Sequence, residues 1–187
     1  GISLTGNVIV SGNYFMRGTI SPGRAGAAFG ETGILRGDTS LQMEDSTTVQ
    51  MQIGGRGAGD FDQIIGGGTK AVDGTFEAGI VDGFEPDTCE NFVVISGSSV
   101  TGEFDTFLPP PVASNIRWRL FYSPTTVELR ATCLPDIDVD VDLTIFDFLA
   151  FQNLFSLGSA EADFDGDGSL TIFDFLAYQN AFAAGCS

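Results

Sequence analysis

The stretch that decides the fold of the C-terminal part is DFDGDGSLTIFDFLAYQN, residues 163–180. Counted from Asp163, carboxylates stand at loop positions 1, 3, 5 and 12, and a glycine stands at position 6. Calcium takes about six to eight oxygen ligands, and this spacing wraps a loop around the ion while glycine allows a sharp turn. The sequence therefore predicts a calcium-binding loop followed by a helix. The expected ligands are the side chains of Asp163, Asp165, Asp167 and Asp174 and the backbone carbonyl of Ser169.

The same pattern occurs once more upstream. TIFDFLAFQN, residues 144–153, recurs 27 residues later as TIFDFLAYQN, with only Phe151 changed to Tyr178. The ligand positions of this first loop fall on Asp136, Asp138, Asp140 and Asp147, with Asp142 at position 7. Position 6 is Val141, and a β-branched residue resists the conformation that glycine accepts there. We expect calcium in both loops, with the first as the poorer copy.

The helix after each loop is rich in large apolar side chains. In residues 144–155, one stripe is expected to hold Ile145, Phe148, Leu149 and Phe155, while Phe146, Phe151 and Leu154 point elsewhere. Two helices in about fifty residues offer too little interior for so many phenylalanines. Some of them should therefore remain exposed as an adhesive face.

The charge balance changes near Cys133. Residues 134–187 contain ten acidic residues and no Lys or Arg, whereas residues 1–133 contain fifteen acidic residues and all eight basic ones. This change predicts two domains, residues 1–132 and residues 133–187, with Leu134-Pro135 as the hinge.

The upstream domain reads as β structure. Alternating apolar positions occur around residues 49–53 and 76–84, and further strands are expected in FVVISG, IRWRLFY and TVELRAT, with glycine, aspartate and proline turns between them. Residues 6–23, GNVIVSGNYFMRGTISPG, are typical of short solenoid turns. The prediction is a mainly β domain, either a β-sandwich or a short β-solenoid plus a sandwich, followed by a small α-helical domain.

Composition excludes several classes of function. The chain of 187 residues has a formal charge of −17 and no histidine, so nucleic acid and anionic membranes are poor partners. No stretch approaches the roughly 20 apolar residues that span a membrane. Without histidine, Ser-His and Cys-His catalytic devices are absent, and no spacing singles out a catalytic pair among Asp60, Asp62, Asp82 and Glu85. We therefore expect no enzyme. Because the first residue is Gly1 and no signal region precedes it, we also expect a processed product or a fragment.

The duplicated loop and helix resemble a dockerin, the calcium-dependent module that plugs into a β-sandwich partner called a cohesin. The form that opens with CLPD at residues 133–136 and closes with AGC at residues 184–186 is similar to the C-terminal anchors of planctomycete secreted proteins. The resemblance covers residues 133–187, and Val141 departs from it. It implies contact with a partner through Ile145, Phe146, Gln152, Asn153, Ile172, Phe173, Gln179 and Asn180.

The same resemblance implies that the two ends of the module meet, so that Cys133 and Cys186 form a disulfide. Cys89 is then left over; the alternatives are a pairing of Cys89 with Cys133 or with another chain. Disulfides are typical of exported proteins, so we expect a secreted or cell-surface location.

Residues 41–133 are similar to C-terminal β modules of large bacterial surface proteins of the autotransporter-like and planctomycete types. The shared segments are QMQIGG, FDQI, GTFEAGIVDGF and GEFDTFLPP followed by Trp118 and Tyr122. This resemblance implies secretion and display rather than chemistry.

Two non-catalytic functions follow. In the first, the calcium-loaded module docks onto a β-rich surface of the next copy of the chain, and the head-to-tail contact propagates into an extracellular filament. In the second, the module tethers a β domain, such as a polysaccharide-binding one, to a separate cell-surface scaffold. The sequence favours the first slightly.

Overall fold

The computed structural model describes residues 4–5, 14–23, 32–111, 116–140 and 142–186. The chain divides into two compact units. The solenoid unit comprises Gly1–Pro86, Asn91–Val112 and Trp118–Arg130, and the helical unit comprises Asp87–Glu90, Ala113–Arg117 and Ala131–Ser187.

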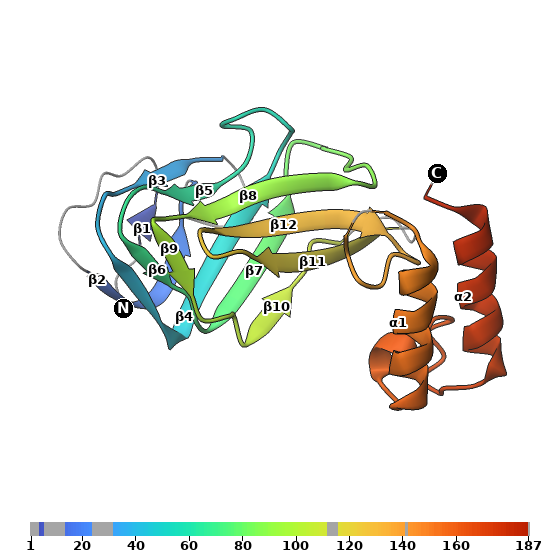
Figure 1. Cartoon of the computed structure of the whole chain (residues 1–187). Coiled ribbons are helices and arrows are strands. Elements are labelled where there is room, and N and C mark those ends of the chain that lie inside the picture. The colour runs from blue at the N-terminus through green and yellow to red at the C-terminus, as the bar shows by residue number, and fades with distance from the viewer. Residues whose placement is uncertain (1–3, 6–13, 24–31, 112–115, 141, 187) are drawn as a thin grey trace. The chain divides into compact units, whose positions relative to one another are not determined.

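The strands form two sheets (Figure 1). The seven-stranded sheet contains β1 (Leu4–Thr5), β2 (Tyr14–Ser21), β4 (Leu41–Ile53), β6 (Thr69–Ala71), β7 (Thr75–Ile80), β9 (Ser99–Thr101) and β10 (Thr106–Leu108). The five-stranded sheet has the order β11 (Ile116–Tyr122), β12 (Thr126–Cys133), β8 (Glu90–Ser96), β5 (Gln63–Ile65) and β3 (Ile34–Arg36).

The register identifies a solenoid-like coil. Tyr14 pairs with Leu41, Leu41 with Lys70, and Lys70 with Val100, all between parallel strands; the steps of 27, 29 and 30 residues are each one turn of the coil. Four threonines stand in a row across β2, β4, β7 and β10: Thr19, Thr48, Thr75 and Thr106. The other sheet repeats the pattern, since β3 pairs with β5 and β5 with β8 in parallel.

The coil is longer than the sequence suggested. We expected solenoid turns in residues 6–23, of which 6–13 lie outside the described residues, but the parallel pairing continues from β2 to β10. A sandwich is therefore wrong for this stretch. Parallel and antiparallel strands have the same period-2 alternation, so the pattern alone could not separate the two.

The alternating residues point into the coil as expected. Val49, Met51 and Ile53 of β4 and Phe76 of β7 are completely buried. Between β6 and β7 the chain turns at Gly74, where φ is +81° and a Cβ atom would lie 2.3 Å from the carbonyl oxygen of Thr47. Only glycine fits at this corner, because both the backbone angle and the close approach exclude a side chain.

The helical unit packs two helices around stacked aromatic rings. It contains α1 (Ile145–Ser156), the short η1 (Ala160–Ala162) and α2 (Ile172–Ala184). Phe151 of α1 and Tyr178 of α2 are fully buried, with ring centroids 4.0 Å apart and planes 2° from parallel. The Tyr178 hydroxyl donates to the Pro135 carbonyl oxygen at 3.3 Å. The two positions at which the repeats differ are thus the centre of this core.

The predicted helix stripe is partly wrong. Phe148 and Phe155 do pack against the core, but so do Phe151 and Leu154, whereas Ile145 and Leu149 are exposed. Period-3.6 reasoning gave too little weight to the ring stacking between the repeats, which turns Phe151 inward. None of the helices in the described part of the chain has the length and apolar character needed to span a bilayer.

Candidate metal centre and docking face

Each loop is organised by the aspartate at position 12, which also begins the following helix. Asp174 Oδ1 accepts hydrogen bonds from the backbone N–H groups of Phe164 (2.8 Å) and Asp165 (3.2 Å), and its Oδ2 accepts one from Thr171 (2.7 Å). The Thr171 side chain accepts from Phe173 N, so threonine and aspartate form a capping box at the start of α2. Loop closure and helix initiation therefore depend on one carboxylate.

The first loop repeats these contacts. Asp147 accepts from Ile137 N at 2.8 Å, from Asp138 N at 3.3 Å and from Thr144 N at 2.7 Å, and the Thr144 capping box begins α1. The duplication seen in the sequence is thus a duplication of geometry.

The carboxylates at positions 1, 3 and 12 converge in both loops. The ligand oxygens of Asp136, Asp138 and Asp147 all lie within 4.8 Å of one another, and so do those of Asp163, Asp165 and Asp174. Carboxylates brought this close repel one another, and a divalent cation bound by all three would relieve the repulsion. An oxygen-only donor set with no sulfur or imidazole suits Ca²⁺ rather than Zn²⁺.

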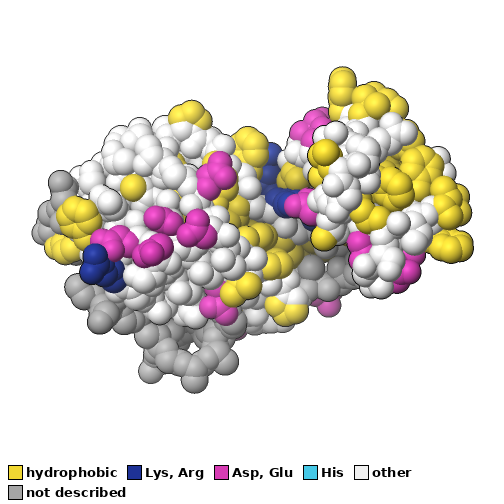
Figure 2. All heavy atoms as spheres, turned by 90° about the horizontal axis from the view of Figure 1, so that it is seen from below, with side chains coloured by type: hydrophobic (Ala, Val, Ile, Leu, Met, Phe, Trp, Pro, Cys, Tyr) yellow, Lys and Arg dark blue, Asp and Glu magenta, His cyan; other side chains and the backbone are white. Residues whose placement is uncertain are grey.

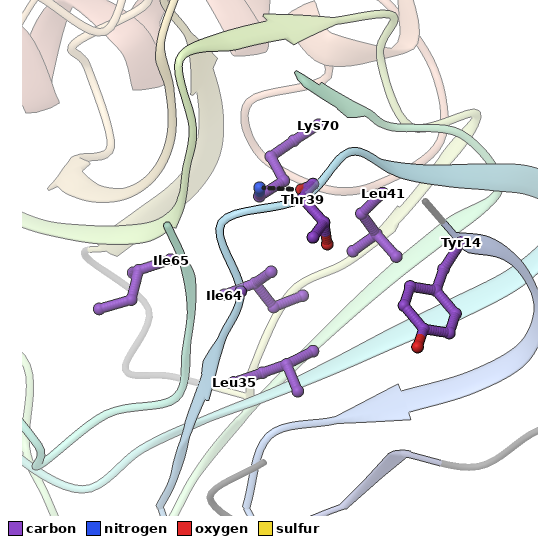
Figure 3. A pocket seen from close by; sticks show the side chains of 8 residues that line it. Tyr14, Leu35, Thr39, Leu41, Ile64, Ile65 and Lys70 are labelled. Carbon is purple, nitrogen blue, oxygen red and sulfur yellow. Dashed lines mark hydrogen bonds between the residues drawn. The ribbon is translucent and has the colours of Figure 1, made fainter. Parts of the chain in front are cut away.

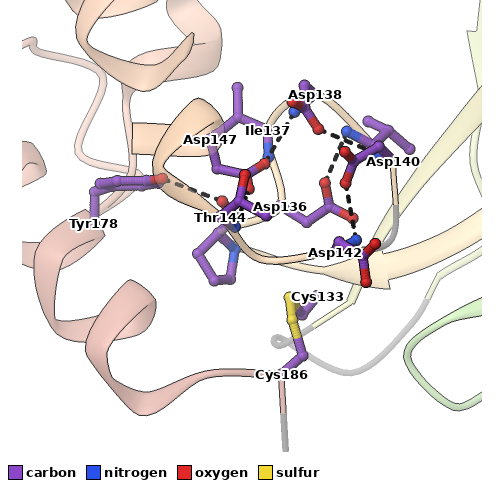
Figure 4. The surroundings of a disulfide bond; sticks show 12 residues. Cys133, Asp136, Ile137, Asp138, Asp140, Asp142, Thr144, Asp147, Tyr178 and Cys186 are labelled. Atoms are coloured by element: carbon purple, nitrogen blue, oxygen red, sulfur yellow. Dashed lines mark hydrogen bonds between the residues drawn. A yellow bond between two sulfur atoms is a disulfide. The ribbon is translucent and has the colours of Figure 1, made fainter. Parts of the chain in front are cut away.

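The other expected ligands lie further round each loop. Asp140 and Asp167, at position 5, are not part of the triads; their Oδ1 atoms accept from Asp142 N and Ser169 N, both at 2.8 Å. Asp142 is exposed (Figure 4). The arrangement fits a calcium ion held by the triad, with positions 5 and 7 as additional ligands.

The electrostatics of the two loops show competition for negative charge. Desolvation, followed by the charges of Asp167, Asp174 and Asp163, raises the pKa of Asp165 above its ordinary value. In the first loop, desolvation and then the charge of Asp147 raise the pKa of Asp138. The Thr171 N–H has the opposite effect and lowers the pKa of Asp174. The position-3 aspartates are therefore the ones that a bound cation would relieve most.

The structure also reveals a difference between the loops at position 4. Val139 has φ of +62°, and its counterpart Gly166 has φ of +76°. Left-handed backbone is costly for a β-branched residue and free for glycine. Sequence reasoning concentrated on position 6, where Gly168 has φ of +83° and Val141 lies outside the described residues. The valine and glycine at position 4 were the available signal, and it was missed.

Each helix carries an exposed apolar set just after its loop. The sets are Ile145, Phe146 and Leu149 on α1 and, 27 residues later, Ile172, Phe173 and Leu176 on α2. Phe146 is 65% exposed and Phe173 is 64% exposed. Figure 2 shows hydrophobic side chains gathered over the helical unit, with acidic side chains beside them. We call these six residues the apolar sets.

The predicted partner-binding residues all lie at the surface. Ile145, Phe146, Ile172 and Phe173 belong to the apolar sets, and Gln152, Asn153, Gln179 and Asn180 are exposed further along the same helices. Burial of equivalent residues differs little between the repeats, so each repeat presents the same groups.

The helical unit is tied at its two ends by a disulfide. Cys133 and Cys186 are bonded, with Cα atoms 5.2 Å apart (Figure 4), which agrees with the predicted pairing. The alternative pairing of Cys89 with Cys133 is excluded by this bond, and Cys89 has an exposed thiol. The bond links the residue before the first loop to the end of α2, and Asp136 N donates to the Cys133 carbonyl oxygen at 3.1 Å.

Two charged side chains buried in the solenoid unit have structural partners. Lys70 lines a small apolar pocket with Tyr14, Leu35 and Ile64 (Figure 3). It is 2% exposed, and its ammonium group donates to the carbonyl oxygens of Thr39, at 3.0 Å, and Gly67. Burial lowers the pKa of Lys70, but the two carbonyls hold the ammonium in place as a clamp between neighbouring turns of the coil.

Asp62 is the other buried charge. Its Oδ1 accepts from Gly33 N at 2.6 Å and its Oδ2 from Gln52 N at 3.0 Å. Burial raises the pKa of Asp62 to about 6, although these N–H donors act in the opposite direction. Of the four acidic residues considered for catalysis, Asp62 is thus committed to the backbone, and Asp60 accepts from Gly57 N at 3.0 Å.

No protein-family model matches this chain, and no curated protein is significantly similar to it.

Proposed function

We propose that the protein is a non-catalytic, secreted or cell-surface component whose helical unit binds calcium and docks onto a β-rich partner. The single observation that carries this proposal is the duplicated loop in which three carboxylates converge directly before an exposed apolar set. A metal-dependent loop and an adhesive helix start are joined in one residue, the position-12 aspartate.

The metal links the two activities physically. Asp147 and Asp174 accept the backbone N–H groups that close each loop and take part in the capping box that starts each helix. Calcium bound to the triad would fix these aspartates, and with them the first turns that carry Phe146 and Phe173. Such coupling of metal binding to local folding is common in small metal-binding domains.

The resemblance to dockerins supports the same function. It agrees with the loop spacing, with the terminal disulfide and with the exposure of the eight residues expected to contact a partner. It also supplies the kind of partner, a β-rich domain. The disulfide and the solenoid-like coil are compatible with an extracellular protein.

Two partners satisfy this description: the solenoid unit of a second copy, which would give a head-to-tail filament, and a separate β-rich scaffold, which would make the module a tether. Light scattering and electron microscopy of the purified chain in calcium and in a chelator distinguish them. Fibres that form only in calcium indicate self-docking, and a calcium-loaded monomer indicates a separate partner. A helical unit that neither binds calcium nor changes on chelation would contradict the proposal.

A further inference from the structure

We infer that the apolar sets bind a protein surface bordered by Lys and Arg, and that this partner is not a second copy of the chain. The inference rests on the proposed docking function and specifies its partner. It is carried by charge: where the carboxylates lie around the apolar sets, and where the chain's own basic side chains are engaged.

The surroundings of the apolar sets are acidic on every described segment that leads to them. Asp138, Asp140 and Asp142 are exposed in the first loop, directly before Ile145. In the second loop, Asp165 and Asp167 are exposed before Ile172. Residues 134–187 contain ten acidic and no basic residues, so two bound Ca²⁺ ions would change the charge of this stretch only from −10 to −6. A partner that buries the apolar sets must approach this field.

The solenoid unit of another copy is a poor match for such a field. Residues 1–133 carry fifteen acidic and eight basic residues, a balance of −7. Arg17 is paired with Glu44 at 2.5 Å and Arg130 with Glu128 at 3.0 Å. Lys70 is buried with its ammonium group on two carbonyls. Like charges across an interface oppose association, and these basic groups are not available to reverse the sign.

A rim of Lys and Arg on the partner would complement the carboxylates while the apolar sets supply the buried contact. Rim charges mainly accelerate association and select partners, whereas buried apolar groups hold the complex together. The two contributions can therefore be separated by salt and by mutation.

The test uses two model peptides of about ten residues, one alternating leucine with lysine and one alternating leucine with glutamate, so that both present an apolar β face. Binding of each to the full chain is followed by fluorescence anisotropy in calcium and in a chelator. The expected result is a dissociation constant at least about tenfold lower for the lysine peptide, with weaker binding as salt is raised.

Chelation separates this docking from simple attraction to an acidic protein. Removing calcium makes the loops more negative, so nonspecific attraction of the lysine peptide would increase, whereas docking that needs the folded loops would be lost. The double variant Phe146→Ser/Phe173→Ser should lose most of the binding. The matched control Phe15→Ser, which removes an equally exposed phenylalanine from the solenoid unit, should not.

Sedimentation velocity completes the test. The calcium-loaded chain should remain monomeric at all salt concentrations. Calcium-dependent self-association that the double variant abolishes, or equal binding of the two peptides, would overturn the inference while leaving the docking function intact. Failure to bind calcium, or retention of peptide binding by the double variant, would instead contradict the proposed function.

Discussion

The two units of this chain bury carboxylates in different ways. In the solenoid unit, Asp62 has no solvent exposure and is held by backbone N–H groups of neighbouring turns. In the helical unit, Asp147 and Asp174 are equally buried, but each lies beside two further carboxylates. The first arrangement needs only the chain, whereas the second carries a repulsion that an ion would remove. The comparison indicates that one unit is stable by itself and the other is conditional on calcium.

The largest expected difference between the units follows from removal of the metal. An ion at about a thousand times its Kd stabilises the site by about 4 kcal/mol, so chelation should lower the unfolding free energy of the helical unit by about this amount per ion. The solenoid unit should be unaffected. Circular dichroism at a helix-sensitive wavelength, in calcium and in chelator, follows the helical unit during denaturation.

Variants give the same test without a chelator. Asp163→Ala/Asp174→Ala should reproduce the loss, because it removes two ligands and the acceptor that starts α2. The exposed Asp45→Ala in the solenoid unit is the matched control. If helix content and stability are the same in all conditions, the contrast between the units disappears.

The next largest effect concerns the disulfide. Cys133 and Cys186 close a loop of 53 residues, and in the chain-entropy model this stabilises the folded state by about 4 kcal/mol. Cys133→Ser/Cys186→Ser should therefore destabilise the helical unit by up to about this amount. Cys89→Ser, which leaves the bond intact, should change stability by less than about 0.5 kcal/mol. Equal effects of the two changes in denaturant titrations would show that the clasp does not stabilise this unit.

The solenoid unit should show its own pH dependence through Asp62. The pKa of Asp62 is about 6 in the folded chain, compared with an ordinary value of 3.8. The folded state then binds the proton more tightly than the unfolded state, so this group's contribution to stability falls as pH rises from about 4 to about 6. The decrease amounts to about 3 kcal/mol.

Carbon-13 NMR of the aspartate carboxyl groups measures this titration directly. The resonance that Asp62→Asn removes should titrate with a midpoint near pH 6. A midpoint below pH 4 would mean that the backbone donors outweigh burial, and that the solenoid unit contains no stored charge cost at neutral pH.

The smallest predicted effect compares the two loops. Val139→Gly removes the left-handed strain at position 4 of the first loop and should stabilise the calcium-bound helical unit by about 1 kcal/mol. Gly166→Ala introduces the same strain in the second loop and should destabilise it by a similar amount. Thermal unfolding in saturating calcium measures both changes. Effects of the same sign would show that the loops do not share one backbone geometry.

Local spacing was informative where the chemistry is local. The loop ligands, the helix starts and the repeat of 27 residues could be derived from residues 134–187, because each depends on neighbours within about twelve positions. The disulfide followed from the resemblance and agrees with the structure.

The remaining features depend on contacts that a linear pattern does not contain. The length of the coil is set by pairings such as Lys70 with Val100, and the buried ammonium of Lys70 by carbonyls on a neighbouring turn. The orientation of Phe151 depends on Tyr178 in the other repeat. The strain at Val139 is a backbone angle, and valine in a loop gives little warning of it.

Calorimetric titration of the full chain with calcium tests the central claim most directly. The account predicts two ions bound per chain, a gain of helix signal on binding, and weaker binding as pH falls, because protons compete for Asp138 and Asp165, whose pKa values are raised. Helices that are fully formed in a chelator, together with no heat of binding at millimolar calcium, would contradict it.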